Sequence, residues 1–218
     1  PFALVLGDIG EHLAGDDVLR QDLLKAIAER GELVDPNLDL ATLAERVFLT
    51  SGRGKLQRLF QKDIGAAVKT AVPRFLKSVI AHLRPGANTT LLWLPLLEWA
   101  LAEHNPDRNI YTLMPGAPDA LESRLVMVRR AGEKEWREEE RPPEDLDLRR
   151  DFVILRLYGG YSPEAQPILT TPQLTEDDHI RGLVALRELF PPAWEAHFMG
   201  WLRMHPFLGV GLSVHEWR

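Results

Sequence analysis

The chain has 218 residues, 45% of them hydrophobic and 27% charged, which is the composition of a folded globular protein rather than of a disordered segment. Its formal net charge of −6 argues against general nucleic-acid binding, because neutralising phosphates requires a basic surface. The absence of cysteine excludes disulfides, thiolate nucleophiles and cysteine metal ligands, and it favours a reducing compartment.

The length suits a single α/β domain with a sizeable core. No apolar run reaches the roughly 18 to 20 residues that span a bilayer, and no secretory signal precedes the first strand. We therefore expect a cytoplasmic protein without membrane contact. Because strand motifs lie at both ends of the sequence, we expect the domain to belong to a longer protein, with flanking domains or other subunits of an oligomeric assembly as its partners.

The first predicted strand covers Phe2–Leu6 and runs into the glycine turn Gly7–Gly10. Apolar residues at spacings of three and four then predict a helix around Leu19–Ala28, with Asp16 or Asp17 as N-cap. A strand, a glycine turn and a helix in this order are typical of the first half of a nucleotide-binding βαβ unit. A strand-to-helix turn without a ligand fits the same residues.

Residues from about 35 to 105 are predicted to be mostly helical and to form an insertion beside a sheet. Pro95 suggests that one of these helices begins or bends there. Strands are expected at Asn109–Leu113 and Leu125–Val128, followed by a charged surface connection over Gly132–Arg150. The remaining expected elements are helices over Glu176–Phe190 and Ala193–His205 and a last buried strand within Pro206–Ser213.

The most distinctive stretch is Phe152–Tyr161, a short apolar run that ends at Gly159 and Gly160. It predicts a strand covered on both faces, and in open α/β sheets ligands lie just beyond the carboxyl ends of such strands. Tyr158 is therefore at a position where chemistry is expected. The alternation of strands and helices predicts a Rossmann-like α/β fold, a parallel sheet with helices on both faces and a helical insertion.

Motifs at five predicted strand ends resemble, in order, those of the sirtuin-like domain family, in particular its divergent bacterial branch in defence and conflict systems. The segment Gly7–Gly15 resembles the family's first glycine motif, and Ile110–Leu113 with Pro118–Glu122 resembles its ribose-loop strand and following helix. Leu157-Tyr158-Gly159 is similar to the family's Leu-His-Gly. The two later motifs are Ile168–Thr170 with Glu176–Asp178, and Phe207–Ser213.

The resemblance implies a domain that binds NAD, or an ADP-ribose-like nucleotide, and cleaves the nicotinamide bond. It places Tyr158 at the position of the catalytic base and makes Asp119 a second candidate that could touch a ribose, although N-capping also accounts for Asp119. The residues at the cofactor-binding positions are Gly7, Asp8, Gly10, Glu11, Gly15, Thr112, Gly159, Gly211 and Ser213. No histidine spacing predicts a metal site.

The sequence departs from the family pattern at the chemical positions. Tyr158 replaces a histidine, and a phenol that titrates near ~10 is a poor base at neutral pH. Ile9 replaces a glycine and would crowd a pyrophosphate, while Asp8 and Glu11 place anions near the expected phosphates. Ala117 or Pro118 stands where the family has an asparagine.

These departures favour a catalytically degenerate sirtuin-like domain, or pseudoenzyme, that acts as a structural or nucleotide-sensing module of an antiviral defence system. Tyr158 would then either donate a hydrogen bond to a nucleotide or simply fill the former pocket. One alternative is an active NAD hydrolase that uses another base, with Glu11 or Asp119 as candidates. The other is an assembly module that binds no ligand.

Overall fold

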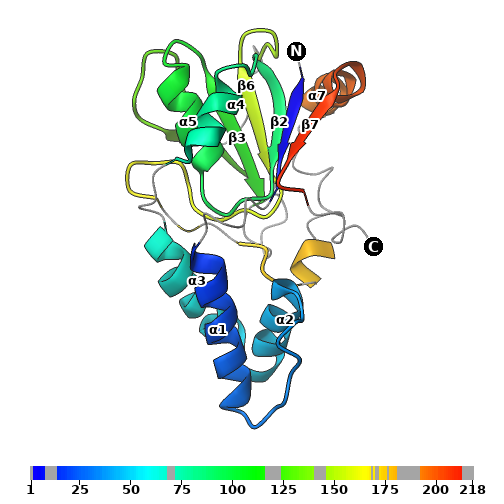
Figure 1. Cartoon of the computed structure of the whole chain (residues 1–218). Coiled ribbons are helices and arrows are strands. Elements are labelled where there is room, and N and C mark those ends of the chain that lie inside the picture. Colours follow the sequence, from blue (N-terminus) through cyan, green and yellow to red (C-terminus); the bar gives the residue numbers. More distant parts are fainter. Residues whose placement is uncertain are drawn as a thin grey trace. The chain divides into compact units, whose positions relative to one another are not determined.

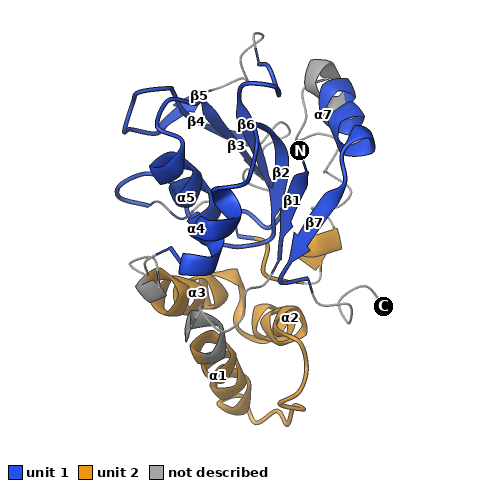
Figure 2. Ribbon diagram, turned by 45° about the horizontal axis from the view of Figure 1, so that its top comes forward, with its two compact units in different colours: residues 1–9, 71–172, 184–218 blue, residues 10–70, 173–183 orange. Residues whose placement is uncertain are grey.

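A sheet of seven strands organises the larger part of the chain (Figure 1). In this computed structural model the described residues are 2–7, 14–67, 72–115, 124–139, 146–167, 169, 172–175, 177–180 and 192–212. They fall into two compact units, which Figure 2 distinguishes by colour. Unit 1 comprises Pro1–Ile9, Ala71–Pro172 and Val184–Arg218, and unit 2 comprises Gly10–Thr70 and Gln173–Leu183.

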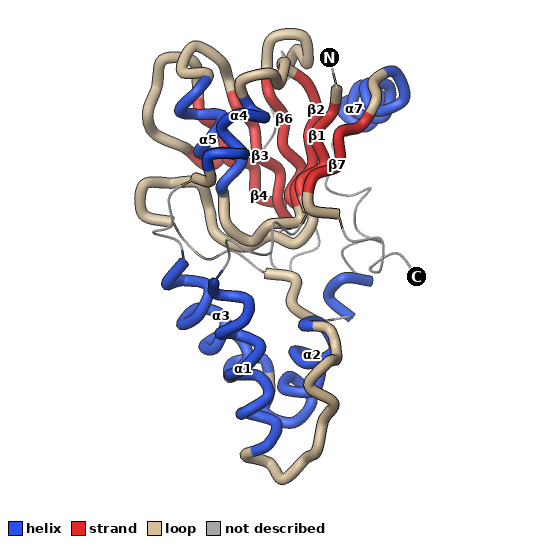
Figure 3. The backbone as a smooth tube through the Cα atoms, in the orientation of Figure 1, coloured by secondary structure: helices blue, strands red, loops and turns tan. Residues whose placement is uncertain are grey.

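The sheet of unit 1 has the strand order β5-β4-β3-β6-β2-β1-β7 (Figure 2), and Figure 3 draws its strands in red. Five neighbouring strands are parallel, and β4 and β5 extend the sheet by antiparallel pairing. The strand bounds are Ala3–Leu6 (β1), Gly86–Thr90 (β2), Ile110–Pro115 (β3), Arg124–Arg129 (β4), Arg137–Glu139 (β5), Phe152–Arg156 (β6) and Phe207–Val210 (β7). The predicted α/β fold with a mostly parallel sheet is therefore confirmed.

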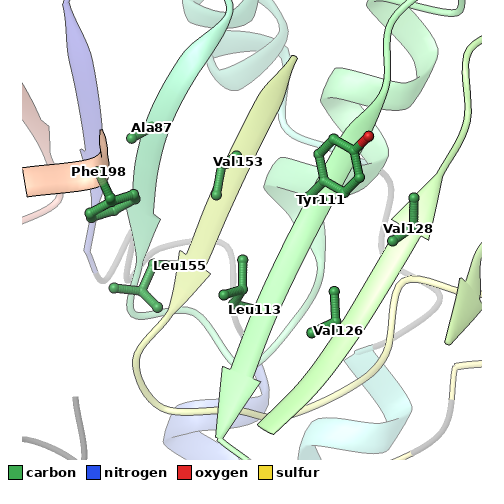
Figure 4. Packing of buried hydrophobic residues seen from close by; sticks show 8 residues of the cluster. All are labelled: Ala87, Tyr111, Leu113, Val126, Val128, Val153, Leu155 and Phe198. Atoms are coloured by element: carbon green, nitrogen blue, oxygen red, sulfur yellow. The ribbon is translucent and has the colours of Figure 1, made fainter. Parts of the chain in front are cut away.

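Helices cover both faces of this sheet. On one face, Phe198 of helix α7 (Pro192–Met204) packs in a cluster with Val153 and Leu155 of β6, and Figure 4 shows this cluster. Arg156, the next residue along β6, projects to the opposite face, where it meets Glu98 of α5 (Leu96–His104). Helix α4 (Arg74–Ile80) packs against α5. Pro95 immediately precedes α5, as its position in the sequence predicted.

The prediction of a mostly helical insertion over about residues 35–105 missed strand β2. Gly86–Thr90 form a strand in the interior of the sheet, between β6 and β1. Its small and polar residues have little intrinsic preference for strands, so its conformation depends on pairing on both sides. Gly86 is needed there because a Cβ atom would lie 2.2 Å from the indole of Trp201. The absence of an apolar pattern explains why the sequence did not reveal this strand.

Two further predictions are corrected. The connection Gly132–Arg150 contains the short strand β5, whose charged residues pair with β4. The last strand, β7, was predicted to be buried because it is apolar, but it lies beside β1 at the end of the sheet. Phe207 is 57% exposed there.

Unit 2 contains three mutually packed helices, α1 (Ala14–Ala28), α2 (Leu40–Ser51) and α3 (Arg53–Ala67). Apolar side chains at helical spacing form their shared core, and the buried members are Leu19, Leu23, Ala26, Ile27, Leu43, Ala44, Val47, Leu56, Phe60 and Ile64. Because α1 begins at Ala14, Asp16 and Asp17 lie in its first turn, and the prediction that one of them is the N-cap is wrong.

The helix predicted from Glu176 begins as its sequence indicated. Residues 177–180 are helical, and the remainder of the predicted helix lies outside the described residues. The Asp178 carboxylate accepts from the Thr175 backbone N–H at 3.3 Å, and the Thr175 hydroxyl accepts from the Asp178 N–H at 3.1 Å. This reciprocal pair is a capping box. Arg53 of α3 forms an ion pair with the same carboxylate at 2.5 Å.

Asp39 is the N-cap of α2, since its Oδ1 accepts from the Thr42 backbone N–H at 2.8 Å. We expect Asp39→Ala to lower the free energy of unfolding by about 1 kcal/mol, and Asp39→Asn, which keeps the accepting oxygen, to cost clearly less. Urea unfolding followed by the helical circular dichroism signal measures both. An Asp39→Ala variant as stable as the parent protein would contradict this role.

The same cap predicts a pH dependence. Burial acts to raise the pKa of Asp39, but hydrogen bonds from Thr42 and from the backbone N–H groups of Asp39 and Ala41 together leave the pKa below its ordinary value. The stabilisation by a carboxylate of lowered pKa is complete above its unfolded-state pKa and disappears as the pH falls through its folded-state pKa. The difference in stability between the parent protein and Asp39→Ala should therefore shrink on acidification. A difference that stays constant from neutral to strongly acidic pH would contradict this.

Candidate functional site at the strand ends

The place where this fold class binds ligands lies between β2 and β6. These neighbouring parallel strands are followed by helices on opposite faces, because β2 leads into α5 and the chain after β6 leads to α7. In open α/β sheets the crevice forms where connections diverge in this way, just beyond the carboxyl ends of the strands. The residues that follow Thr90 and Arg156 are therefore the candidate site.

Arg156, the last residue of β6, occupies this position with a side chain that has no exposed surface. Its Nη2 donates to the carbonyl oxygens of Leu92 at 2.9 Å and Trp93 at 2.6 Å, both in the connection after β2. Its Nη1 donates to the carbonyl oxygen of Tyr161, in the connection after β6, and lies 3.4 Å from the sulfur of Met114. One guanidinium thus joins the two connections that follow β2 and β6.

Glu98 provides the balancing charge. Its carboxylate oxygen Oε1 lies 3.5 Å from Nε of Arg156, and neither side chain is exposed. Burial raises the pKa of the Glu98 carboxyl, while Arg156 and the Thr112 hydroxyl oppose that increase. Burial likewise lowers the pKa of Arg156, and Glu98 opposes that decrease. The pair keeps a cation in a place that bulk solvent does not reach, and removing either charge alone would be costly.

Further hydrogen bonds join the chain after β6 to the chain after β2. The Tyr161 N–H donates to the Trp93 carbonyl oxygen at 2.8 Å, and the indole Nε1 of Trp99 donates to the Pro163 carbonyl oxygen at 3.0 Å. Gly160 has a φ of +108°, and a Cβ there would lie 2.2 Å from the Trp93 oxygen. Glycine at 160 thus permits the two connections to touch, which is a structural reason for its presence.

The predicted glycines of β1 and β7 also have a structural explanation. Gly7 donates its N–H to the Val210 carbonyl oxygen at 2.8 Å, and a Cβ on Gly7 would lie 2.5 Å from the Gly211 carbonyl oxygen. Gly211 itself has a φ of +69°. The two strand ends therefore approach each other more closely than any side chain would permit. This contact accounts for Gly7 and Gly211 without a bound nucleotide.

The other predicted site residues are not all at the strand ends. Tyr158 lies two residues beyond β6 and is half-buried, and Gly159 beside it has a φ of +61°. Thr112 is buried in β3, on the side of the sheet that faces Glu98. Gly15 lies within α1 and belongs to unit 2, whereas Gly7 belongs to unit 1. The predicted residues Asp8, Gly10, Glu11, Asp119 and Ser213 lie outside the described residues.

Arg156 and Glu98 were not among the residues predicted for the site, although both carry a detectable signal in the sequence. Arg156 is the charged residue within the apolar run Phe152–Leu157, and Glu98 is enclosed by Leu96, Leu97, Trp99 and Ala100. A charge placed within a fully apolar strand or helix is expected to have a partner of opposite sign. A search for two such charges would have paired them.

A scan of the sequence against protein-family models finds no match, and a search of curated proteins finds none either. The sirtuin-like assignment consequently rests on the motif resemblance. Over the part of the chain that the structure describes, no three histidine, aspartate or glutamate side chains come together as metal ligands. Within those same residues, no helix is both long and apolar enough to cross a bilayer.

Arg156→Met tests the importance of the buried pair. We expect it to lower the free energy of unfolding by about 3–5 kcal/mol, because Glu98 is left as an uncompensated buried charge. Adding Glu98→Leu should recover part of this loss, although the carbonyl groups of Leu92, Trp93 and Tyr161 still lack their donor. Arg156→Lys is the matched control, because lysine keeps the positive charge but lacks the planar set of N–H donors of the guanidinium.

Denaturant unfolding of the single and double variants gives the coupling energy between the two positions. If the costs of Arg156→Met and Glu98→Leu simply added, the ion pair would not be a stabilising unit. Full stability of Arg156→Lys would show that the bonds to several carbonyl groups are unimportant.

Proposed function

We propose that this chain is a catalytically degenerate sirtuin-like domain of Rossmann-like fold that serves as a structural or nucleotide-sensing module of a bacterial defence system. The main support is the position of Arg156. Its guanidinium and the carbonyl groups that it binds occupy the strand-end region between β2 and β6, where this fold class ordinarily binds its ligand.

Two further observations favour a module over an enzyme. Gly7 and Gly160 serve close backbone contacts, so these strand-end glycines need no pyrophosphate to explain them. Tyr158 takes the position of the family's histidine, and a phenol is almost wholly protonated at neutral pH. The defence context and the nucleotide come from the family resemblance alone.

The alternative of an active NAD hydrolase retains one argument. Glu11 and Asp119, the candidate replacement bases, are carboxylic acids, and a carboxylate acts as a general base more readily than a phenol at neutral pH. The alternative of an assembly module without a ligand is favoured by the same closure at Arg156 that favours degeneracy. Binding and turnover therefore have to be measured separately.

We predict no release of nicotinamide when the purified chain is incubated with NAD, with chromatographic detection and the Tyr158→Phe and Glu11→Ala variants run in parallel. Turnover by the parent chain that either variant abolishes would contradict the proposal. A calorimetric titration with NAD and with ADP-ribose then separates the remaining cases. Binding without turnover supports a sensing module, and no binding of either compound supports a structural one.

A further inference from the structure

Four atoms of one buried cluster have unused hydrogen-bonding capacity. Three elements contribute them, namely α5, β3 and β6. The atoms are Oε1 and Oε2 of Glu98, Oγ1 of Thr112 and Nε of Arg156, and none has a hydrogen-bond partner among the described residues. Their side chains have no exposed surface. Buried polar groups are nearly always hydrogen-bonded, so four together in one cluster need a physical explanation.

The geometry explains why direct contact does not satisfy them. Nε of Arg156 and Oε1 of Glu98 are 3.5 Å apart, which is longer than a good N–H···O hydrogen bond. Thr112 lies close enough to act on the Glu98 pKa, yet its oxygen makes no well-formed bond. The cluster thus has two free donors, the Arg156 Nε–H and the Thr112 hydroxyl, and three free acceptors.

We propose that this cluster is a binding site for one internal water molecule, held between Glu98, Thr112 and Arg156. The water accepts from Nε–H of Arg156 and donates to Oε1 of Glu98 and to Oγ1 of Thr112. With the water in place, the contact between Thr112 and Glu98, which falls short of a well-formed bond in this structure, is completed by the Thr112 hydroxyl donating to Oε2 of Glu98. All four atoms are satisfied, and the water makes three hydrogen bonds, the typical number for a buried water molecule.

Water fits this set of groups better than the two other candidates. A metal cation would lie beside the Arg156 guanidinium and would be repelled by it. A proton on Glu98 would let the carboxyl donate to Thr112, but it would leave Nε–H of Arg156 without a partner and the guanidinium without a balancing charge. A neutral molecule that both donates and accepts avoids both costs.

The inference stands apart from the proposed function. A water molecule at this position would complete the closure of the region between β2 and β6 whether or not a nucleotide binds elsewhere on the chain. The nicotinamide and binding assays can therefore contradict the proposed function while the water site is present. Equally, the water site can be absent while those assays support the proposed function.

A crystal structure of the parent chain, at a resolution that places ordered water, is the direct test. We expect one water peak within hydrogen-bonding distance, about 2.7–3.2 Å, of Glu98, Thr112 and Arg156. A direct hydrogen bond between Nε of Arg156 and the Glu98 carboxylate, with no water peak beside it, would overturn the inference. So would a divalent cation at the same position.

Two solution measurements test the inference without crystals. Oxygen-17 relaxation of the solvent counts long-lived internal waters, and we expect Thr112→Val to lose one relative to both the parent chain and Thr112→Ser, which keeps the hydroxyl. Equal counts in the three proteins would contradict the site. Carbon-13 spectra of labelled glutamate should show Glu98 ionised at neutral pH, and a protonated Glu98 would contradict the assignment of donors and acceptors.

Discussion

The larger unit of this protein depends on one buried charge. Arg156 ends the central strand β6 without any exposed surface, and its guanidinium has to be balanced and hydrogen-bonded inside the protein. Taking an arginine and a glutamate out of water costs several kcal/mol for each ion, so the arrangement persists only if the partners are held in place. Glu98 on α5 supplies the opposite charge, and carbonyl groups of Leu92, Trp93 and Tyr161 supply the acceptors. Helix, strand and both connections are therefore mutually constrained.

Close backbone contacts within the protein explain the glycines at the strand ends. In a nucleotide-binding domain a glycine at such a position lets the backbone approach a phosphate. Here Gly160 lets the backbone approach Trp93, and Gly7 lets it approach Gly211. The same residue type in the same place of the fold thus serves contacts within the protein. A glycine motif alone consequently cannot distinguish a ligand site from a close contact between two backbone segments. The atoms that would lie nearest to a Cβ added at the glycine do distinguish the two cases.

The sequence predicted what depends on local pattern and missed what depends on pairing across the fold. Strands β1, β6 and β7 and helix α7 followed from apolar runs and spacing. Strand β2 was missed because Gly86–Thr90 carries no apolar pattern and is stabilised by β1 and β6. The pair Glu98 and Arg156 was missed because each residue, taken alone, is a charge that interrupts an apolar segment. The two residues are far apart in the sequence and come into contact only when α5 packs on the sheet. Strand β7 is exposed because it lies at the edge of the sheet. The apolar residues of a strand do not reveal its place in the strand order.

Arg156 holds the connections after β2 and β6 together. Hydrogen exchange at the Tyr161 backbone N–H, which donates to the Trp93 carbonyl oxygen, reports on this lock directly. We predict exchange as slow as that of the β6 amides, far slower than at the exposed residues Ala165 and Gln166, and unchanged by saturating NAD. Exchange at Tyr161 as fast as at Ala165, or a clear change in its rate on addition of NAD, would contradict a closed and structural strand-end region.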